Sequence, residues 1–305
     1  MRPQRTRGPP PSGTPRTHAP LLSALRVARR VVTSRGHGPS ARALATFMRW
    51  DRVVVMLSRC LDEITAQGYT VLEGVHSQED VGLFRDALHR IHAALGRPPL
   101  TAPTKTEVGP SCVMSAVGLV VARLLEHAPE LAPRVLHPLV RAVLLGSLGP
   151  DLEIEVIAGA VSDSARAMLP WHAHVGGPDE DLVDPSAACR TLAPRRLSLL
   201  VYLDELAPGA GQLMIFPRRQ RDPVAQPFPD ARAPWSGQVT LSCGVGTAVL
   251  LDERTWHAAG TRSSPGLRRF VGGQFVRSAA ERATRADLAL AGLRGALLGG
   301  PVGGG

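Results

Sequence analysis

Two histidines stand two residues apart in Leu169-Pro-Trp-His-Ala-His-Val, and a third follows much later in Thr255-Trp-His-Ala-Ala. On a β-strand, residues i and i+2 point to the same face, so His172 and His174 can both reach one ion. His257 on another strand can complete a facial set of three ligands, which leaves positions open for substrate, cosubstrate or O₂. The spacing therefore predicts a metal centre of His172, His174 and His257. Two surface histidines and one core histidine are the alternative explanation.

Strands must hold these histidines, and the sequence after Gly149 favours strands. Short β-rich segments separated by glycine and proline turns are typical of a sandwich or barrel. The segments expected to form strands are 153–161, 166–173, 196–204, 211–216, 237–242, 246–251 and 268–276. We therefore predict an α+β protein built on a jelly roll.

Helices are expected on both sides of this β-rich region. The pattern is helical over 51–67, and a short strand follows in Tyr69-Thr-Val-Leu-Glu-Gly. Ser77 followed by two acidic residues predicts the start of the next helix, whose apolar spacing continues to Leu95. Further helices are expected over 115–126 and 129–148, and a last one over about 279–298.

The net charge of +9 comes from one segment of the 305-residue chain. Residues 1–50 carry ten arginines and no acidic residue, and the remaining residues hold 25 basic and 26 acidic groups. The folded part is therefore nearly neutral, and few aromatic residues are available for base stacking, so we expect no nucleic-acid partner. No uncharged run of 18 apolar residues occurs, which argues against a membrane span.

The chain divides into three predicted parts. Residues 1–50 form a disordered basic tail, 51–298 a jelly-roll domain, and 299–305 a flexible glycine-rich tail. The arginine-rich, acid-free composition of 1–47 is that of an organelle transit peptide, and the alternatives are an unstructured extension or a true start at Met48. The four cysteines form no paired motif, which favours reduced thiols and a cytoplasmic location, or a mitochondrial or other organellar one if the tail is a transit peptide.

The residues that flank the histidines form a series of short motifs. The series runs through Gln67-Gly-Tyr-Thr-Val-Leu-Glu-Gly, Leu169-Pro-Trp-His, Leu197-Ser-Leu-Leu-Val-Tyr-Leu-Asp-Glu, Gly211-Gln-Leu-Met-Ile-Phe-Pro, Gly246-Thr-Ala-Val-Leu-Leu-Asp-Glu-Arg-Thr-Trp-His and Arg268-Arg-Phe. In content and order this series, which covers about 62–277, resembles the phytanoyl-CoA dioxygenase family. The resemblance implies a cupin-like double-stranded β-helix that carries a non-haem Fe(II), 2-oxoglutarate-dependent oxygenase.

The resemblance also implies roles for individual residues. His172 and His257 match the family's iron ligands, and O₂ would be the second cosubstrate. Arg268, 11 positions after His257, matches the arginine that pairs with the far carboxylate of 2-oxoglutarate. A planar guanidinium suits this task because it offers two parallel donors to a carboxylate. The neighbouring Arg269 should face the other way on a strand.

Other residues of these motifs are expected to be structural. Asp252 and Arg254 match the family pattern before the distal histidine, where we expect them to stabilise a turn. Trp171 and Trp256 each precede a candidate ligand, so the alternation of side chains should turn them into the core. Trp235 is a loop residue with no predicted place.

One position departs from the family. His-x-Asp or His-x-Glu is the family pattern, and His174 occupies the acidic position here. A carboxylate offsets the charge of Fe²⁺, whereas imidazole is neutral. Three outcomes stay open: a three-histidine iron site, a site completed by an acid from Asp179-Glu-Asp181, or a site that has lost its metal.

The sequence thus predicts an Fe(II) and 2-oxoglutarate-dependent dioxygenase that hydroxylates a small-molecule or lipid-like substrate, with an atypical His-x-His motif. The alternative is a catalytically inactive jelly-roll binding or regulatory protein of the same family that has lost its metal. Because the carboxylate is absent, the assignment as an enzyme stays open at this point.

Overall fold

The computed structural model describes residues 41–182, 193–219 and 222–298. The predicted basic tail lies outside the described residues as far as residue 40, and so does the predicted glycine-rich tail at 299–305. Residues 41–50, expected to be disordered, instead belong to the helix α2 (Ala41–Gln67). All described strands lie in one compact unit, Ala45–Gly305.

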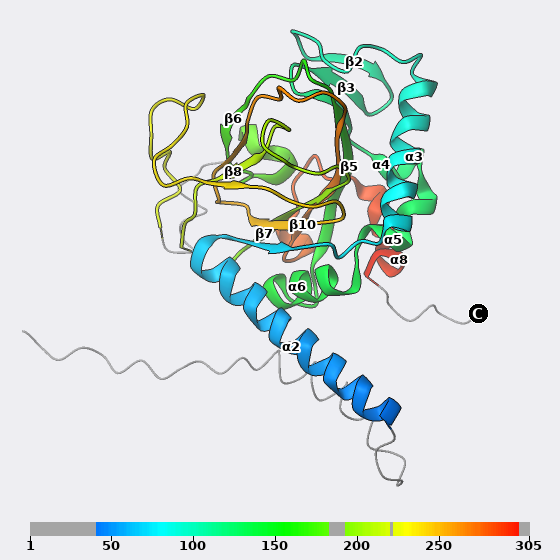
Figure 1. Ribbon diagram of the computed structural model, residues 1–305, viewed down its shortest axis with the longest axis vertical. Helices are drawn as coiled ribbons and strands as arrows, with labels where there is room; N and C mark the ends of the chain where they lie inside the picture. Colours follow the sequence, from blue (N-terminus) through cyan, green and yellow to red (C-terminus); the bar gives the residue numbers. More distant parts are fainter. Residues whose placement is uncertain (1–40, 183–192, 220–221, 299–305) are drawn as a thin grey trace, which may run out of the picture. The chain divides into compact units, whose positions relative to one another are not determined.

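Two antiparallel sheets form the centre of this unit (Figure 1). The eight-stranded sheet has the order β1-β10-β7-β12-β5-β4-β3-β2 and the four-stranded sheet the order β6-β11-β8-β9. The strands of the first sheet are β1 (Tyr69–Leu72), β2 (Thr106–Gly109), β3 (Cys112–Ser115), β4 (Gly118–Val121), β5 (Glu153–Ser162), β7 (Arg196–Tyr202), β10 (Ala248–Asp252) and β12 (Arg268–Val276). Those of the second are β6 (Leu169–His172), β8 (Leu213–Ile215), β9 (Val239–Leu241) and β11 (His257–Ala259). The predicted mixed fold with a jelly roll is therefore confirmed.

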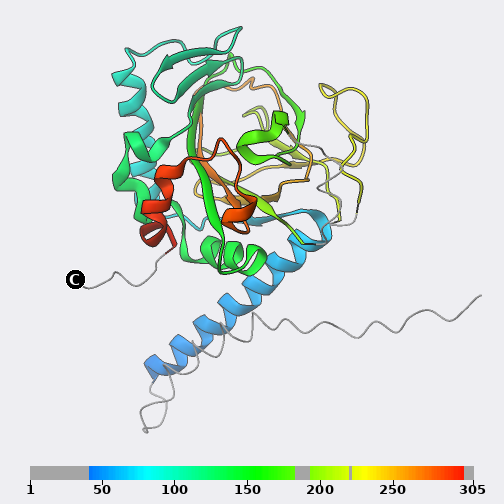
Figure 2. The same ribbon diagram turned by 180° about the vertical axis from the view of Figure 1, so that it is seen from behind.

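Helices cover the outer face of the large sheet. Figures 1 and 2 show α3 (Gln78–Ala94) against β5 and α6 (Pro138–Leu148) against β7. Apolar side chains from α2, α3 and α6 and from the strands form one hydrophobic core, in which Ile64, Phe84, Leu144, Leu199 and Val271 are buried. Strand β10 is covered on both faces, so all of its residues are buried, and those before Asp252 are apolar.

The predicted start of α3 is confirmed. The Ser77 side chain accepts a hydrogen bond from the backbone N–H of Asp80 at 3.0 Å, and Glu79 and Asp80 lie in the first turn. The cap satisfies one of the unpaired N–H groups of the helix, and the acids suit its positive end. Beyond the helix, at Gly159 of β5, a Cβ would lie 2.5 Å from the Leu88 side chain, so the absence of a side chain lets α3 approach the sheet.

The prediction of a helix over 115–126 is wrong. This apolar segment instead forms parts of β3 and β4, followed by the short α4 (Leu124–His127). Gly118, the first residue of β4, leaves the turn between the strands with a φ of +124°, and a Cβ there would lie 2.5 Å from the Val161 carbonyl oxygen. Pairing of β4 with β5 supplies hydrogen bonds that no local pattern reveals.

The helices predicted over 129–148 and about 279–298 are each divided into shorter helices. The segment 129–148 divides into η1 (Pro129–Leu131), α5 (Ala132–Val135) and α6, because residues before a proline avoid the helical conformation and His137 precedes Pro138. The C-terminal segment divides into η3 (Ala279–Glu281), η4 (Leu288–Leu293) and α8 (Arg294–Leu298). Among the described residues, no single helix is long and apolar enough to cross a membrane, although Pro129–Val135 and Pro138–Leu148, bent by 72°, together satisfy the length and composition criteria.

Candidate metal centre

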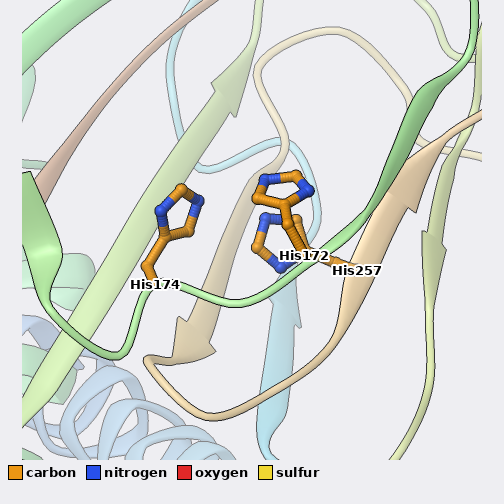
Figure 3. Close-up of side chains that lie close together, drawn as sticks. All are labelled: His172, His174 and His257. Atoms are coloured by element: carbon orange, nitrogen blue, oxygen red, sulfur yellow. The ribbon is translucent and has the colours of Figure 1, made fainter. Parts of the chain in front are cut away.

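The three predicted histidines lie together (Figure 3). One nitrogen from each ring can be chosen so that all three lie within 4.8 Å of one another. The ring centroids of His172 and His257 are 4.2 Å apart, and that of His174 lies 4.9 Å from the first and 5.0 Å from the second. Such spacing places three imidazole nitrogens around a volume the size of one metal ion.

Strand pairing accounts for two of the three positions. His172 is the last residue of β6 and His257 the first of β11, and these strands pair with the two histidines directly opposite each other. Directly opposite residues on antiparallel strands share a face of the sheet, so both imidazoles point the same way. The short strand β11 was not among the segments predicted to form strands, although His257 was expected to lie on one.

His174 has a different support from the one expected. Strand β6 ends at His172, so His174 lies in the loop that follows it. Its backbone N–H donates to the Glu253 carbonyl at 2.8 Å, and its carbonyl accepts from the Gly177 N–H at 2.9 Å. These bonds hold the loop against the Asp252–His257 turn, and His174 thus joins the cluster through a contact between distant segments.

Hydrogen bonds select the tautomer of two rings. Nδ1 of His172 lies 2.8 Å from the Pro170 carbonyl oxygen, and Nδ1 of His257 lies 3.0 Å from the Thr255 carbonyl oxygen. A carbonyl oxygen only accepts, so each Nδ1 carries the proton and each Nε2 keeps its lone pair. Burial, and then the neighbouring His172 and His174, hold the pKa of His257 well below its ordinary value. The ring is therefore neutral, which is the form that binds a metal.

An ion-pair network lies behind the His174 loop. Glu253 is buried and forms ion pairs with Arg195 at 3.3 Å and Arg196 at 3.4 Å, and Arg196 also contacts Glu155 at 2.7 Å. Burial raises the pKa of Glu253 to about 7, although the two arginines oppose this. The side chain of Glu253 thus holds the network together, and its backbone carbonyl holds His174. Sequence reasoning did not find this support.

The alternative acidic ligand has a different environment. The Asp179 carboxylate accepts hydrogen bonds from the Thr284 hydroxyl at 2.8 Å, the Thr284 N–H and the Arg285 N–H at 2.8 Å. It therefore holds the segment after η3, and in the described part of the chain no carboxylate joins the histidine cluster. The side chains of Glu180 and Asp181 lie outside that part.

Arg268 lies where a buried anion could be bound. It is the first residue of β12, is 5% exposed, and its guanidinium carbon lies 5.4 Å from the Tyr202 ring centroid and 5.3 Å from that of Phe270. Its Nε is buried without a hydrogen-bond partner. Arg269 points the other way, as strand alternation predicts, and pairs with Asp204 at 2.7 Å.

One cavity of about 390 Å³ connects these groups. It opens between the two sheets, and its wall includes the three histidines and Arg268. Most of the remaining wall is apolar, with Leu200 from one sheet and Leu213 from the other. It also contains Arg166, which sequence reasoning did not single out, because nothing in the local sequence separates it from other arginines in this arginine-rich chain.

The motif residues that were expected to be structural stabilise a turn or pack in the interior. Asp252 and Arg254 form a buried ion pair at 2.6 Å in the turn before His257. Trp171 is buried and stacks on Trp235 with a centroid distance of 4.3 Å, and the ring of Trp256 lies 5.6 Å from that of Trp235. The loop tryptophan that had no predicted place is therefore the centre of an aromatic cluster behind the histidines.

The fold is shared with solved structures of proteins that bind or depend on 2-oxoglutarate. HygX from Streptomyces hygroscopicus, solved with nickel and 2-oxoglutarate bound, is 17% identical, with a TM-score of 0.55 over 72% of this chain and 86% of that one. SnoK, a non-haem α-ketoglutarate-dependent carbocyclase from nogalamycin biosynthesis, is 22% identical, with a TM-score of 0.53 over 72% and 83%. EctD from S. alaskensis, solved with 2-oxoglutarate and 5-hydroxyectoine, is 18% identical, with a TM-score of 0.54 over 74% and 77%. At these identities the likeness establishes the fold.

The family is established by the sequence. No curated protein matches this chain significantly. The family model for phytanoyl-CoA dioxygenase, however, matches residues 64–270, which is well over half of the chain and includes all three histidines and Arg268. The motifs that carried the resemblance fall inside this match, and the protein therefore belongs to the phytanoyl-CoA dioxygenase family.

Proposed function

We propose that this protein is an Fe(II) and 2-oxoglutarate-dependent oxygenase that hydroxylates a small molecule. The observation that carries the proposal is the placement of three imidazoles and one buried, incompletely paired guanidinium in a single cavity. Family membership and the shared fold with oxygenases that bind 2-oxoglutarate support it.

The residues present fit a ferrous ion. Three neutral nitrogen donors suit a first-row transition metal, and the protonated Nδ1 atoms of His172 and His257 leave Nε2 available. When bound, Fe(II) with 2-oxoglutarate and O₂ supplies the hydroxylation of an unactivated C–H bond, with succinate and CO₂ as the other products.

The side chains and backbone of the protein would position the metal and the cosubstrate and exclude water from the site. The Pro170 and Thr255 carbonyls orient the two strand histidines, and the Glu253 carbonyl holds the loop of the third. Arg268 would bind the far carboxylate of 2-oxoglutarate, since the aromatic rings beside it fix its guanidinium and its Nε needs an acceptor. The apolar wall of the cavity would keep water away from the reacting atoms.

The histidine in the acidic position has a consequence for the order of binding. The donor set carries no negative charge, so it attracts a divalent cation less than a set with one carboxylate does. A dianionic cosubstrate would restore the missing charge. We therefore expect 2-oxoglutarate to strengthen metal binding, and metal to strengthen 2-oxoglutarate binding by the same factor.

An anaerobic Fe(II) titration by calorimetry tests the proposal, with and without 2-oxoglutarate. Wild type should bind one ion per chain, more tightly with 2-oxoglutarate, and release succinate slowly in air. His174→Asp should bind at least as tightly as wild type, and His174→Ala and His257→Ala should bind more weakly. The exposed His89 on α3, replaced by alanine, is the matched control and should change nothing.

The second candidate function is a metal-free binding protein, which the absence of a carboxylate from the histidine cluster of the described residues favours. Such a protein would bind no metal in the titration, and chelators would not change its melting temperature. That result would refute the oxygenase proposal and support this one.

A further inference from the structure

The cavity contains a second buried arginine besides Arg268. Arg166 lies between β5 and β6, is 2% exposed, and lines the same cavity as the three histidines. Its Nη1 donates to the Gly260 carbonyl at 2.6 Å. Gly260 follows β11 directly, and Arg268 starts β12 opposite Ser162, the last residue of β5. Both guanidiniums therefore belong to the part of the cavity near the end of β5.

Neither guanidinium has a carboxylate partner among the described residues. In that part of the chain, no ion pair involves Arg166 or Arg268, and the Gly260 carbonyl is the one hydrogen-bond acceptor of the Arg166 guanidinium. The nearby Asp204 is already paired with Arg269 and Arg85. Burial, followed by the charge of Arg268, lowers the pKa of Arg166 to about 9. Two neighbouring buried cations therefore lack a paired anion among the residues that the structure describes.

A third buried arginine in this region provides the contrast. Arg262 donates to three backbone carbonyls, those of Ala210, Ser264 and Pro265. Its hydrogen-bonding capacity is largely used, and its role is to hold the loop before β12. Arg166 and Arg268 have donors to spare, and an isolated buried charge is costly unless a counter-ion binds beside it.

The position of the pair suits one end of a dicarboxylate. Gly260 lies three residues after His257, which at strand rise is about 10 Å between their Cα atoms. An acid group held by the arginines would therefore lie away from the histidines, on the same wall of the cavity. A carboxylate accepts up to about four hydrogen bonds, enough for two guanidiniums.

We propose that Arg166 and Arg268 together bind the far carboxylate of 2-oxoglutarate, so that the site holds this acid group with two arginines. The proposal rests on the proposed function for the identity of the cosubstrate. The two arginines also complement the neutral histidine set. The dianion would then meet the metal ion at the histidines and the two guanidiniums at its other end. A 2-oxo acid that lacks the far carboxylate should gain nothing from Arg166.

Titration of the nickel-loaded protein tests this without turnover. Binding of 2-oxoglutarate and of 2-oxopentanoate, which has the same carbon chain without the far carboxylate, is measured by calorimetry. Arg166→Gln and Arg268→Gln should each weaken 2-oxoglutarate binding by about 10- to 100-fold, the range of a charge-assisted hydrogen bond. Binding of 2-oxopentanoate should stay within about twofold of wild type. Arg269→Gln, which removes a guanidinium facing away from the cavity, should leave both ligands unchanged.

The outcomes separate the two proposals. If Arg268→Gln weakens 2-oxoglutarate binding and Arg166→Gln does not, the role of Arg166 is overturned and the oxygenase proposal stands. If Arg166→Gln weakens the binding of 2-oxoglutarate and of 2-oxopentanoate equally, the role of Arg166 is merely structural. If nickel-loaded wild type binds neither ligand, the proposed function itself fails. If circular dichroism shows that Arg166→Gln does not fold, Arg166→Lys takes its place. Lysine keeps the positive charge and lacks the planar guanidinium, and the affinities for the two ligands are compared in the same way.

Discussion

The turn before His257 depends on a buried ion pair, and its loss should be costly. Asp252 is 2% exposed and Arg254 fully buried. The carboxylate accepts from the Arg254 backbone N–H and Nε, both at 2.9 Å, and from Nη2 at 2.6 Å. Asp252→Ala removes this carboxylate while the guanidinium stays in the interior. Breaking a buried pair in this way costs about 3–5 kcal/mol of unfolding free energy.

Equilibrium urea denaturation of the metal-free protein measures this cost. Glu130→Ala is the matched control, because its pair with Arg90 is exposed and a surface pair contributes about 0–1 kcal/mol. Asp252→Leu combined with Arg254→Met should be less destabilised than Asp252→Ala, because no charge then stays buried. Metal binding should also weaken in Asp252→Ala, since the turn positions His257. A loss no larger than that of Glu130→Ala would refute the reasoning.

Two further predictions concern stability. Burial, with His137 nearby, lowers the pKa of His76 to about 4, so below pH 6.5 the unfolded chain binds a proton that the folded protein does not. The unfolding free energy should therefore fall between pH 6.5 and pH 4 by up to about 1.4 kcal/mol per pH unit, and His76→Gln should reduce that slope in urea denaturation. At Gly272 in β12, a Cβ would lie 2.1 Å from the Leu199 carbonyl oxygen, so Gly272→Ala should cost about 1–3 kcal/mol. Gly292→Ala, with open space around it, should change the urea midpoint little; equal effects would contradict the predicted steric conflict.

Elements whose local pattern agrees with their environment could be predicted from the sequence. The cap at Ser77 is a contact between residues three apart, so α3 was expected where it lies. The strands β5, β7 and β12 were found because β-rich segments bounded by turn residues occur there. Alternation along β12 likewise separated Arg268, which lines the cavity, from Arg269, which pairs with Asp204.

Prediction failed where distant pairing overrides local preference. The apolar segment after Cys112 suits a helix by composition, yet β4 pairs with β5 some 40 residues later and takes the strand conformation. The sequence left open whether Asp179 is a ligand, and the structure places its carboxylate on the backbone of Thr284 and Arg285. Neither partner is close enough in the chain to leave a local signal.

The residues that could do chemistry are evident from the order of amino acids: a His-x-His pair, a distant histidine and an arginine that follows it, within motifs specific enough to indicate the family. How these residues meet depends on the folded chain. The pairing of β6 with β11 sets His172 opposite His257 across 85 residues of chain, and a backbone bond from His174 to Glu253 completes the cluster. Arg166 enters the cavity through packing alone, because its burial is a property of the folded protein.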